Sequence, residues 1–177
     1  MSLSRKAFFK CALLLIILFS VISYALYVSA ESTKYEKLYK FLVELKGWKC
    51  EDPEGMQMDM PELKMIQAMR EYNREGKKFQ ALLIVGSTSA VAGYIQRTDM
   101  NYEDEKTKVT VKEVDGFNTY IFLDKESDSG SISIILNTDD KGGSFFVVSF
   151  EGMNDGEAFN IAKKFDWKGM KKETKDL

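Results

Sequence analysis

"KTKVTVKEVDGFNTYIFL", residues 106–123, places Asp115-Gly116 between two runs that are rich in β-branched and aromatic residues. An Asp-Gly pair in this setting predicts a two-residue β-hairpin, because both residues tolerate the left-handed backbone that the tight turn requires. The second run, Phe117–Leu123, has bulky side chains at both odd and even positions, which is typical of a strand covered on both faces. The stretch therefore predicts an antiparallel hairpin near the centre of a sheet.

Other runs of similar composition predict more strands on either side of this hairpin. Gly76 suits a tight turn between the first two, and "TDDKGG", residues 138–143, suits a turn between the last two. Consecutive strands joined by short turns pair antiparallel, so these runs predict one antiparallel sheet of about six strands. The further predicted strands span residues 63–73, 78–85, 131–137 and 144–150.

A helix is predicted at the start of the domain. Thr33 and Glu36 have the spacing of a capping box, which favours a helix that begins at this point. Apolar residues then recur every three or four positions between residues 35 and 45, which predicts one buried helix face. Gly47 is placed to end the helix.

A second capping-box spacing, Asn154 to Glu157, predicts a C-terminal helix with an apolar face that continues to Met170. "STSAVAGYIQ", residues 87–96, predicts a short inner helix after the second predicted strand. The predicted class is therefore α+β: an antiparallel sheet of about six strands with N- and C-terminal helices packed on it, preceded by an N-terminal signal or transmembrane helix.

Residues 1–30, called the leader below, are predicted to be an export signal. Arg5, Lys6 and Lys10 form a positive start, and an apolar run continues from Cys11 to Val28. The run is long for a signal core and only just long enough to span a bilayer, so a cleaved signal peptide and an uncleaved signal anchor both stay open. With either alternative the rest of the chain is exported. It is predicted to form one domain at 31–170 and a charged disordered tail, "KKETKDL", at 171–177.

Charge and cysteine content narrow the compartment and the partners. The leader contains no acidic residue and three basic ones, so residues 31–177 carry 22 basic and 27 acidic side chains, a net charge of −5. Such a surface gives no reason to expect nucleic acid as a partner. Cys50 is the only cysteine after the leader, which excludes an internal disulfide there. Export without any Asn-x-Ser/Thr sequon favours a bacterial periplasm.

The methionine run "GMQMDMP", residues 55–61, raises the main question about function. Met56, Met58 and Met60 stand at every second position, so an extended backbone would place them on one face. Met65 and Met69 continue the apolar pattern in the next predicted strand. Methionine fills irregular gaps well, and we expect these five side chains to face inward as part of the core.

A soft-metal site is the alternative interpretation of this run. Thioethers together with a thiolate select Cu(I) or Ag(I), which would make Met56, Met58, Met60 and Cys50 the ligands. Two features oppose it: the 177 residues contain no histidine, and same-face residues of one strand stand ~6.6–6.8 Å apart. A methionine-lined groove for a flexible apolar partner is a third interpretation.

Catalytic chemistry has little support. The absence of histidine removes Ser-His, Cys-His and most zinc arrangements. Lys49 could activate Cys50, but Glu51 and Asp52 oppose it. The acidic segments at 99–105, 124–130 and 139–140 are typical of solvated turns and lack the ligand spacing of a calcium loop. A carboxylate-dependent enzyme stays open, with no residues that can be assigned to its site.

These observations predict an exported, non-enzymatic domain that needs no cofactor. One side of its sheet would bind a partner protein, an envelope component or a small ligand. The alternatives are a Cu(I)/Ag(I) carrier and a carboxylate-dependent enzyme. The membrane would be involved only through an uncleaved leader, and the oligomeric state stays open.

Overall fold

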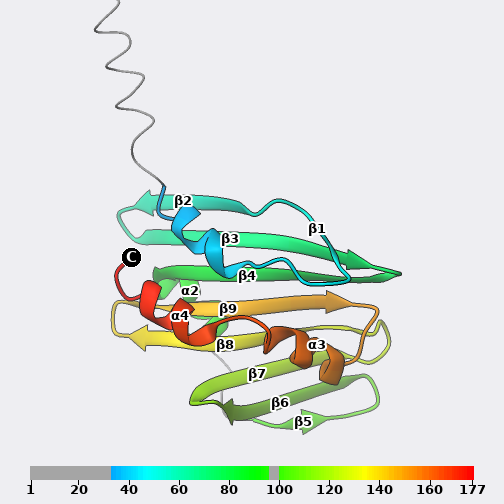
Figure 1. Ribbon diagram of the computed structural model, residues 1–177. Helices are drawn as coiled ribbons and strands as arrows, with labels where there is room; N and C mark the ends of the chain where they lie inside the picture. The colour runs from blue at the N-terminus through cyan, green and yellow to red at the C-terminus, as the bar shows by residue number, and fades with distance from the viewer. Residues whose placement is uncertain (1–32, 96–99) are drawn as a thin grey trace, which may run out of the picture. The chain divides into compact units, whose positions relative to one another are not determined.

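A computed structural model describes residues 33–95 and 100–177, which form one antiparallel sheet with helices on both faces (Figure 1). The strand order is β1-β3-β4-β9-β8-β7-β6-β5, and β2 pairs with β3 at the same edge as β1. The strands are β1 (Lys49–Cys50), β2 (Glu54–Met60), β3 (Leu63–Arg74), β4 (Lys77–Ser87), β5 (Tyr102–Glu103), β6 (Thr107–Val114), β7 (Phe117–Asp124), β8 (Ser129–Asp139) and β9 (Gly142–Glu151). The helices are η1 (Glu36–Phe41), α2 (Thr88–Ile95), α3 (Asp155–Ala162) and α4 (Trp167–Glu173).

Two tight hairpins set the register of the sheet, as the sequence predicts. Asp115 and Gly116 join β6 to β7 with φ values of 54° and 82°. Glu75 and Gly76 join β3 to β4 with φ values of 45° and 79°. Both pairs place two successive residues in the left-handed region, which matches the twist of the strands that they connect. The prediction of an antiparallel sheet is confirmed.

The predicted number of about six strands is wrong, because the described sheet has nine. β1 and β5 contain two residues each, which is too short for any periodicity in the sequence to reveal them. β2 is the methionine run itself, which pairs along its whole length with β3. The missed strands all lie at the two edges of the sheet.

The first helix is shorter and tighter than predicted. η1 is a six-residue 3-10 helix whose N-cap residue, Tyr35, makes no side-chain capping bond, so the predicted capping box of Thr33 and Glu36 is wrong. The apolar positions Leu38 and Leu42 are nevertheless buried, as the periodicity predicts.

Side chains of β3 explain why the helix ends early. The carbonyl of Leu42 accepts a hydrogen bond from Arg70 Nη1, and the carbonyl of Val43 accepts one from the Tyr72 hydroxyl, both at 2.8 Å. These bonds satisfy the backbone at the end of the helix through tertiary contacts, which no local pattern reveals.

The C-terminal region contains two helices where the sequence predicts one. The side chain of Asn154 accepts from the backbone N–H of Glu157 at 2.9 Å, which confirms the predicted N-cap of α3. α3 ends at Ala162, and the side chain of Asp166 begins α4 by accepting from the N–H of Gly169 at 2.9 Å.

Residues 171–177, predicted as a disordered tail, are held on the domain, where Leu177 packs against the front core. α4 continues to Glu173, and Thr174 is buried. Its hydroxyl lies 3.1 Å from Asn137 Nδ2 and 2.9 Å from Ser144 Oγ, and it donates to the carbonyl of Met170 at 2.9 Å. These partners hold the end of the chain on β8 and β9.

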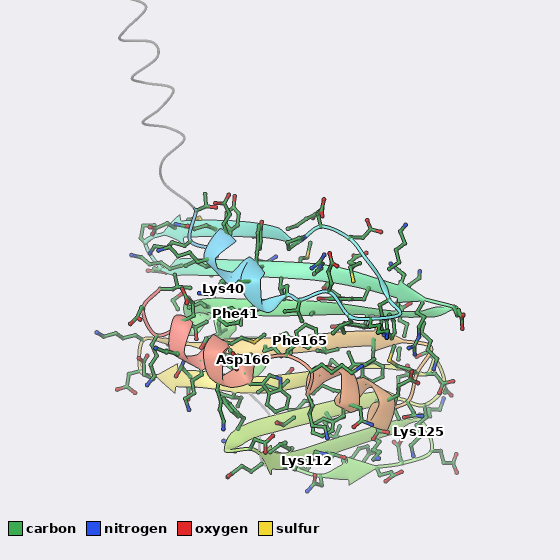
Figure 2. All side chains as sticks on the ribbon, viewed as in Figure 1. Lys40, Phe41, Lys112, Lys125, Phe165 and Asp166 are labelled. Atoms are coloured by element: carbon green, nitrogen blue, oxygen red, sulfur yellow. The ribbon has the colours of Figure 1, made fainter. Side chains whose placement is uncertain are left out.

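The main core lies between the sheet and the three helices η1, α3 and α4, which cover its front face (Figure 1). Tyr72 stacks on Phe79 with ring centres 4.2 Å apart, and Trp48 meets Phe79 edge-on at 4.7 Å. Phe165 contacts Tyr72 edge-on, and Figure 2 shows it on the side of the sheet that carries α3 and α4. This face therefore buries most of the large aromatic side chains.

The back face has much less cover. α2 packs over the middle strands, where Val91 joins Ile84, Phe145 and Val147 in a small second cluster. Met65 is partly buried at the margin of this cluster. The back of the β2–β3 hairpin thus lies at the border of the helix-covered region.

The leader predicted at residues 1–30 lies outside the described residues. Within residues 33–95 and 100–177, no helix has the length and hydropathy that a membrane span requires.

We expect Thr174→Val to lower the free energy of unfolding by about 1–3 kcal/mol, because Asn137 and Ser144 would each lose a buried partner. Urea denaturation measures the change. Lys175→Ala, at the exposed neighbouring position, is the control and should change stability by less than about 0.5 kcal/mol. Equal midpoints for the two variants would contradict the role of this network.

Candidate functional site

The candidate site is the back face of the β2–β3 hairpin. The two strands pair without a bulge from Glu54 opposite Met69 to Met60 opposite Leu63. Paired residues in an antiparallel ladder direct their side chains to the same face. Five methionines therefore share the back face: Met56, Met58, Met60, Met65 and Met69.

The expectation that these methionines face inward is wrong for β2. Met56 is 39% exposed and Met60 is 46% exposed, while Met58 and Met65 are half-buried. The physical reason is position, because β2 is an edge strand and α2 packs mainly against β4 and β9. Methionine side chains thus form an exposed apolar face at one border of the sheet.

Cys50 does not join this face. It pairs with Tyr72, an even-numbered residue of β3 that belongs to the front core, whereas the methionines pair with odd-numbered positions. The Cys50 thiol donates to the carbonyl of Trp48 at 3.6 Å, and its side chain packs against the front core. The predicted ligand set of Met56, Met58, Met60 and Cys50 is therefore divided between opposite faces of the sheet.

β2 and β3 direct two acidic side chains to the methionine face. Glu54 and Glu71 occupy the same face, since they pair with Met69 and Gln80 in the same alternation. Between residues 54 and 73 the basic side chains are Lys64 and Arg70, and both stand at positions of β3 that face the front. A cation bound on the methionine face would thus meet no like charge from these two strands.

The outer edge of β2 is open in the described part of the protein, where β2 pairs only with β3. Every second residue of such a strand directs its N–H and C=O groups away from its partner. Edge strands are usually protected by charged side chains, above all lysine, by proline or by a bulge. The seven residues of β2 have no lysine, proline or bulge, and their two charges are the acidic Glu54 and Asp59. β2 therefore has the properties of a strand that can pair further.

The front of β2 is fixed by the start of the domain. The ring of Tyr35 lies where a Cβ would stand on Gly55, so only glycine permits this close approach. Tyr35 itself packs against the front core. β2 is thus held to the domain from the front while its back and outer edge stay accessible.

A second candidate is a groove of about 1140 Å³ at the end of the sheet near the C-terminus. Lys34 donates to the carbonyl of Leu177 at 3.2 Å beside it. The polar side chains on its floor, Asn137, Ser144 and Thr174, are hydrogen-bonded to one another, so they are engaged in structure. Its charged lining residues are mixed in sign: Lys34, Lys64, Lys141, Lys171 and Lys175 with Asp59, Glu113 and Asp139.

Two acidic side chains in the turns accept hydrogen bonds from the backbone of the same turn. Asp104 Oδ1 accepts from the N–H groups of Lys106 and Thr107, and Asp139 Oδ1 accepts from those of Lys141 and Gly142. A hydrogen bond from Tyr102 and these backbone bonds hold the pKa of Asp104 below its usual range. A general acid needs the opposite shift. Asp99, in the same acidic segment, lies outside the described residues.

Oxygen and thiolate ligands for a metal ion are not gathered together. Among the residues that the structure describes, no three Asp, Glu or Cys side chains could hold one ion.

Comparison of the chain with protein-family models, with curated proteins and with solved structures found no match.

Exposure of the methionines can be checked by oxidation. With dilute hydrogen peroxide, Met56 and Met60 should form sulfoxide roughly tenfold faster than the buried Met153 and Met170, because oxidation depends on access. Peptide mass spectrometry measures the rates, with the exposed Met100 as a positive control. If Met56 and Met60 are oxidised as slowly as Met170, the exposure of their side chains is contradicted.

The ion pair between β6 and α3 predicts a pH dependence. Lys108 Nζ lies 2.7 Å from Asp155 Oδ2, and this hydrogen bond and charge hold the pKa of Asp155 below its usual range. A lowered folded-state pKa stabilises the fold above the unfolded value of about 3.9, and the gain is lost as pH falls through the folded value.

We therefore expect Asp155→Asn to lower the free energy of unfolding by about 0.5 kcal/mol at pH 7, and the difference from wild type to vanish in strong acid. Denaturant midpoints of the variant and of wild type, determined between pH 7 and strong acid, measure the difference. Asp52→Asn, at an exposed loop position, should leave both ends of the range unchanged. A difference that grows as pH falls would contradict the assignment.

Proposed function

We propose that this chain is an exported, non-enzymatic binding module that takes up an extended peptide segment of an envelope protein by strand addition to β2. The observation that supports this most directly is the open, unguarded edge of β2 next to the exposed methionine face. In strand addition, backbone hydrogen bonds supply affinity and alternating side-chain contacts supply specificity.

The side chains of β2 define the chemistry of the partner. On the back, alternate residues of an added strand would meet Met56, Met58 and Met60, which suit flexible apolar side chains. On the front, the other residues would meet Gln57 and Asp59, where Asp59 lies 3.6 Å from Lys64 and is exposed. A segment that alternates apolar and basic residues fits both faces.

The compartment is part of the same proposal. The positive start and the apolar run of residues 1–30 support export to a bacterial periplasm, either with a cleaved signal peptide or with an anchor. Sequencing the N-terminus of the exported protein distinguishes the two: Glu31 marks cleavage, and residue 1 marks an anchor. The net charge of −5 for residues 31–177 disfavours nucleic acid as the partner.

The test uses a capped seven-residue peptide in which leucine and lysine alternate. We expect saturating peptide to slow amide hydrogen exchange in β2 by at least about tenfold, or about 1.4 kcal/mol. A peptide of the same sequence with an N-methyl group on every residue is the matched control, because neither of its backbone edges can form the ladder. Met58→Leu should keep the protection, and Met58→Lys should remove it by placing a guarding charge on the edge.

Two outcomes would overturn the proposal. Equal protection by the N-methylated peptide would show that backbone pairing is not the mode of binding. Protection of β2 amides without peptide that grows with protein concentration would identify a second copy of the chain as the occupant, and sedimentation would then show a dimer.

A further inference from the structure

We propose that the methionine face of the β2–β3 hairpin binds one soft monovalent metal ion, Cu(I) or Ag(I), through the thioethers of Met56, Met58, Met60 and Met65. This inference goes beyond peptide binding, because it uses side-chain sulfur atoms and leaves the backbone edge of β2 free. It also changes the ligand set that the sequence suggests, since Met65 takes the place of Cys50.

Met65 removes the geometric objection to a site on one strand. Met58 and Met65 are directly opposite, and such pairs have Cβ atoms about 4.5–5.5 Å apart. Met56 and Met60 flank Met58 on β2, so each is a diagonal neighbour of Met65, within reach of long side chains. Met65 therefore provides a ligand across from Met58, toward which Met56 and Met60 can both lean, whereas β2 alone has no ligand opposite Met58.

The depth of the four side chains suits an ion that arrives from solvent. Met58 and Met65 are half-buried, and Met65 is held at the margin of the cluster under α2. Met56 and Met60 are exposed and can close over an ion from either side. Met69 is the outlying member, because its sulfur already accepts a hydrogen bond from Gln80 Nε2 at 3.5 Å.

The chemistry of the face selects a soft monovalent cation. Thioethers are neutral, polarisable ligands that suit Cu(I) and bind hard divalent ions poorly. Glu54 and Glu71 are acidic side chains on the same face that do not stand among the four methionines, and the basic Lys49 and Lys78 lie on this face only at its far end, opposite Asn73. The absence of histidine from the chain leaves no imidazole to favour zinc or Cu(II).

The test uses the full chain in mild detergent with Cys11→Ser, which removes the leader thiol as a competing ligand. The methionine methyl groups carry ¹³C, and one equivalent of Ag(I) is added as a probe that does not change oxidation state. We expect the methyl resonances of Met56, Met58, Met60 and Met65 to shift, while that of Met100, which is 66% exposed elsewhere, stays in place. Anaerobic Cu(I) titration against a chromogenic chelator then gives the affinity.

Substitution by leucine separates metal binding from the fold and from peptide binding. Replacing all four methionines with leucine should weaken Cu(I) binding at least tenfold, and Met58→Leu with Met65→Leu serves as a second variant if the first fails to fold. Leucine keeps the apolar volume, so the leucine–lysine peptide should still protect β2. Cys50→Ser should leave the metal affinity unchanged, because Cys50 faces the front core.

Equal shifts at Met100 and at the four hairpin methionines would show non-specific binding and overturn the inference. Unchanged Cu(I) affinity in the folded leucine variants would overturn it as well. Neither result touches the peptide proposal, which depends on the edge of β2.

Discussion

The packing of η1, α3 and α4 against one face of the sheet decides which surfaces of this protein stay open. Tyr72, Phe79 and Trp48 form the aromatic centre of that face, and the Tyr72 hydroxyl also holds the chain where η1 ends. In the described part of the chain, four short helices cannot cover both faces of nine strands. Of the described helices, η1, α3 and α4 pack on the front core, so α2 alone covers the middle of the back. The exposed methionines are a consequence of this unequal cover.

Local signals in the sequence predicted the parts of the fold that local chemistry determines. The Asp115-Gly116 turn and the Asn154 cap both form, because each depends on residues within a few positions of one another. The early end of η1 and the burial of Thr174 depend on partners far along the chain, so no periodicity could reveal them. The same holds for the methionines: alternation correctly places Met56, Met58 and Met60 on one face, but only the strand order shows that this face is at an edge.

The β2–β3 hairpin combines two features that proteins usually keep apart, an unprotected edge and an apolar face. Edges of this kind invite unwanted pairing, and most sheets protect them with charge or curvature. Here the contact between Tyr35 and Gly55 restrains β2 from the front without covering its edge. Flexible thioethers on the back can adapt to several side-chain shapes, whereas branched side chains would impose one. Both proposals for this hairpin depend on the same exposure, yet they use different atoms.

The contact between Lys34 and the last residue, Leu177, brings the two ends of the domain to one corner. A short linker could therefore join them, and new termini could be opened at the Asp115-Gly116 turn without breaking a strand. In such a circular permutant, a fused tag or a surface tether would be attached at the Asp115-Gly116 turn and no longer beside Lys34 and Leu177. Conversely, a protein fused after Leu177 would emerge beside Lys34, so affinity tags belong in an exposed turn instead.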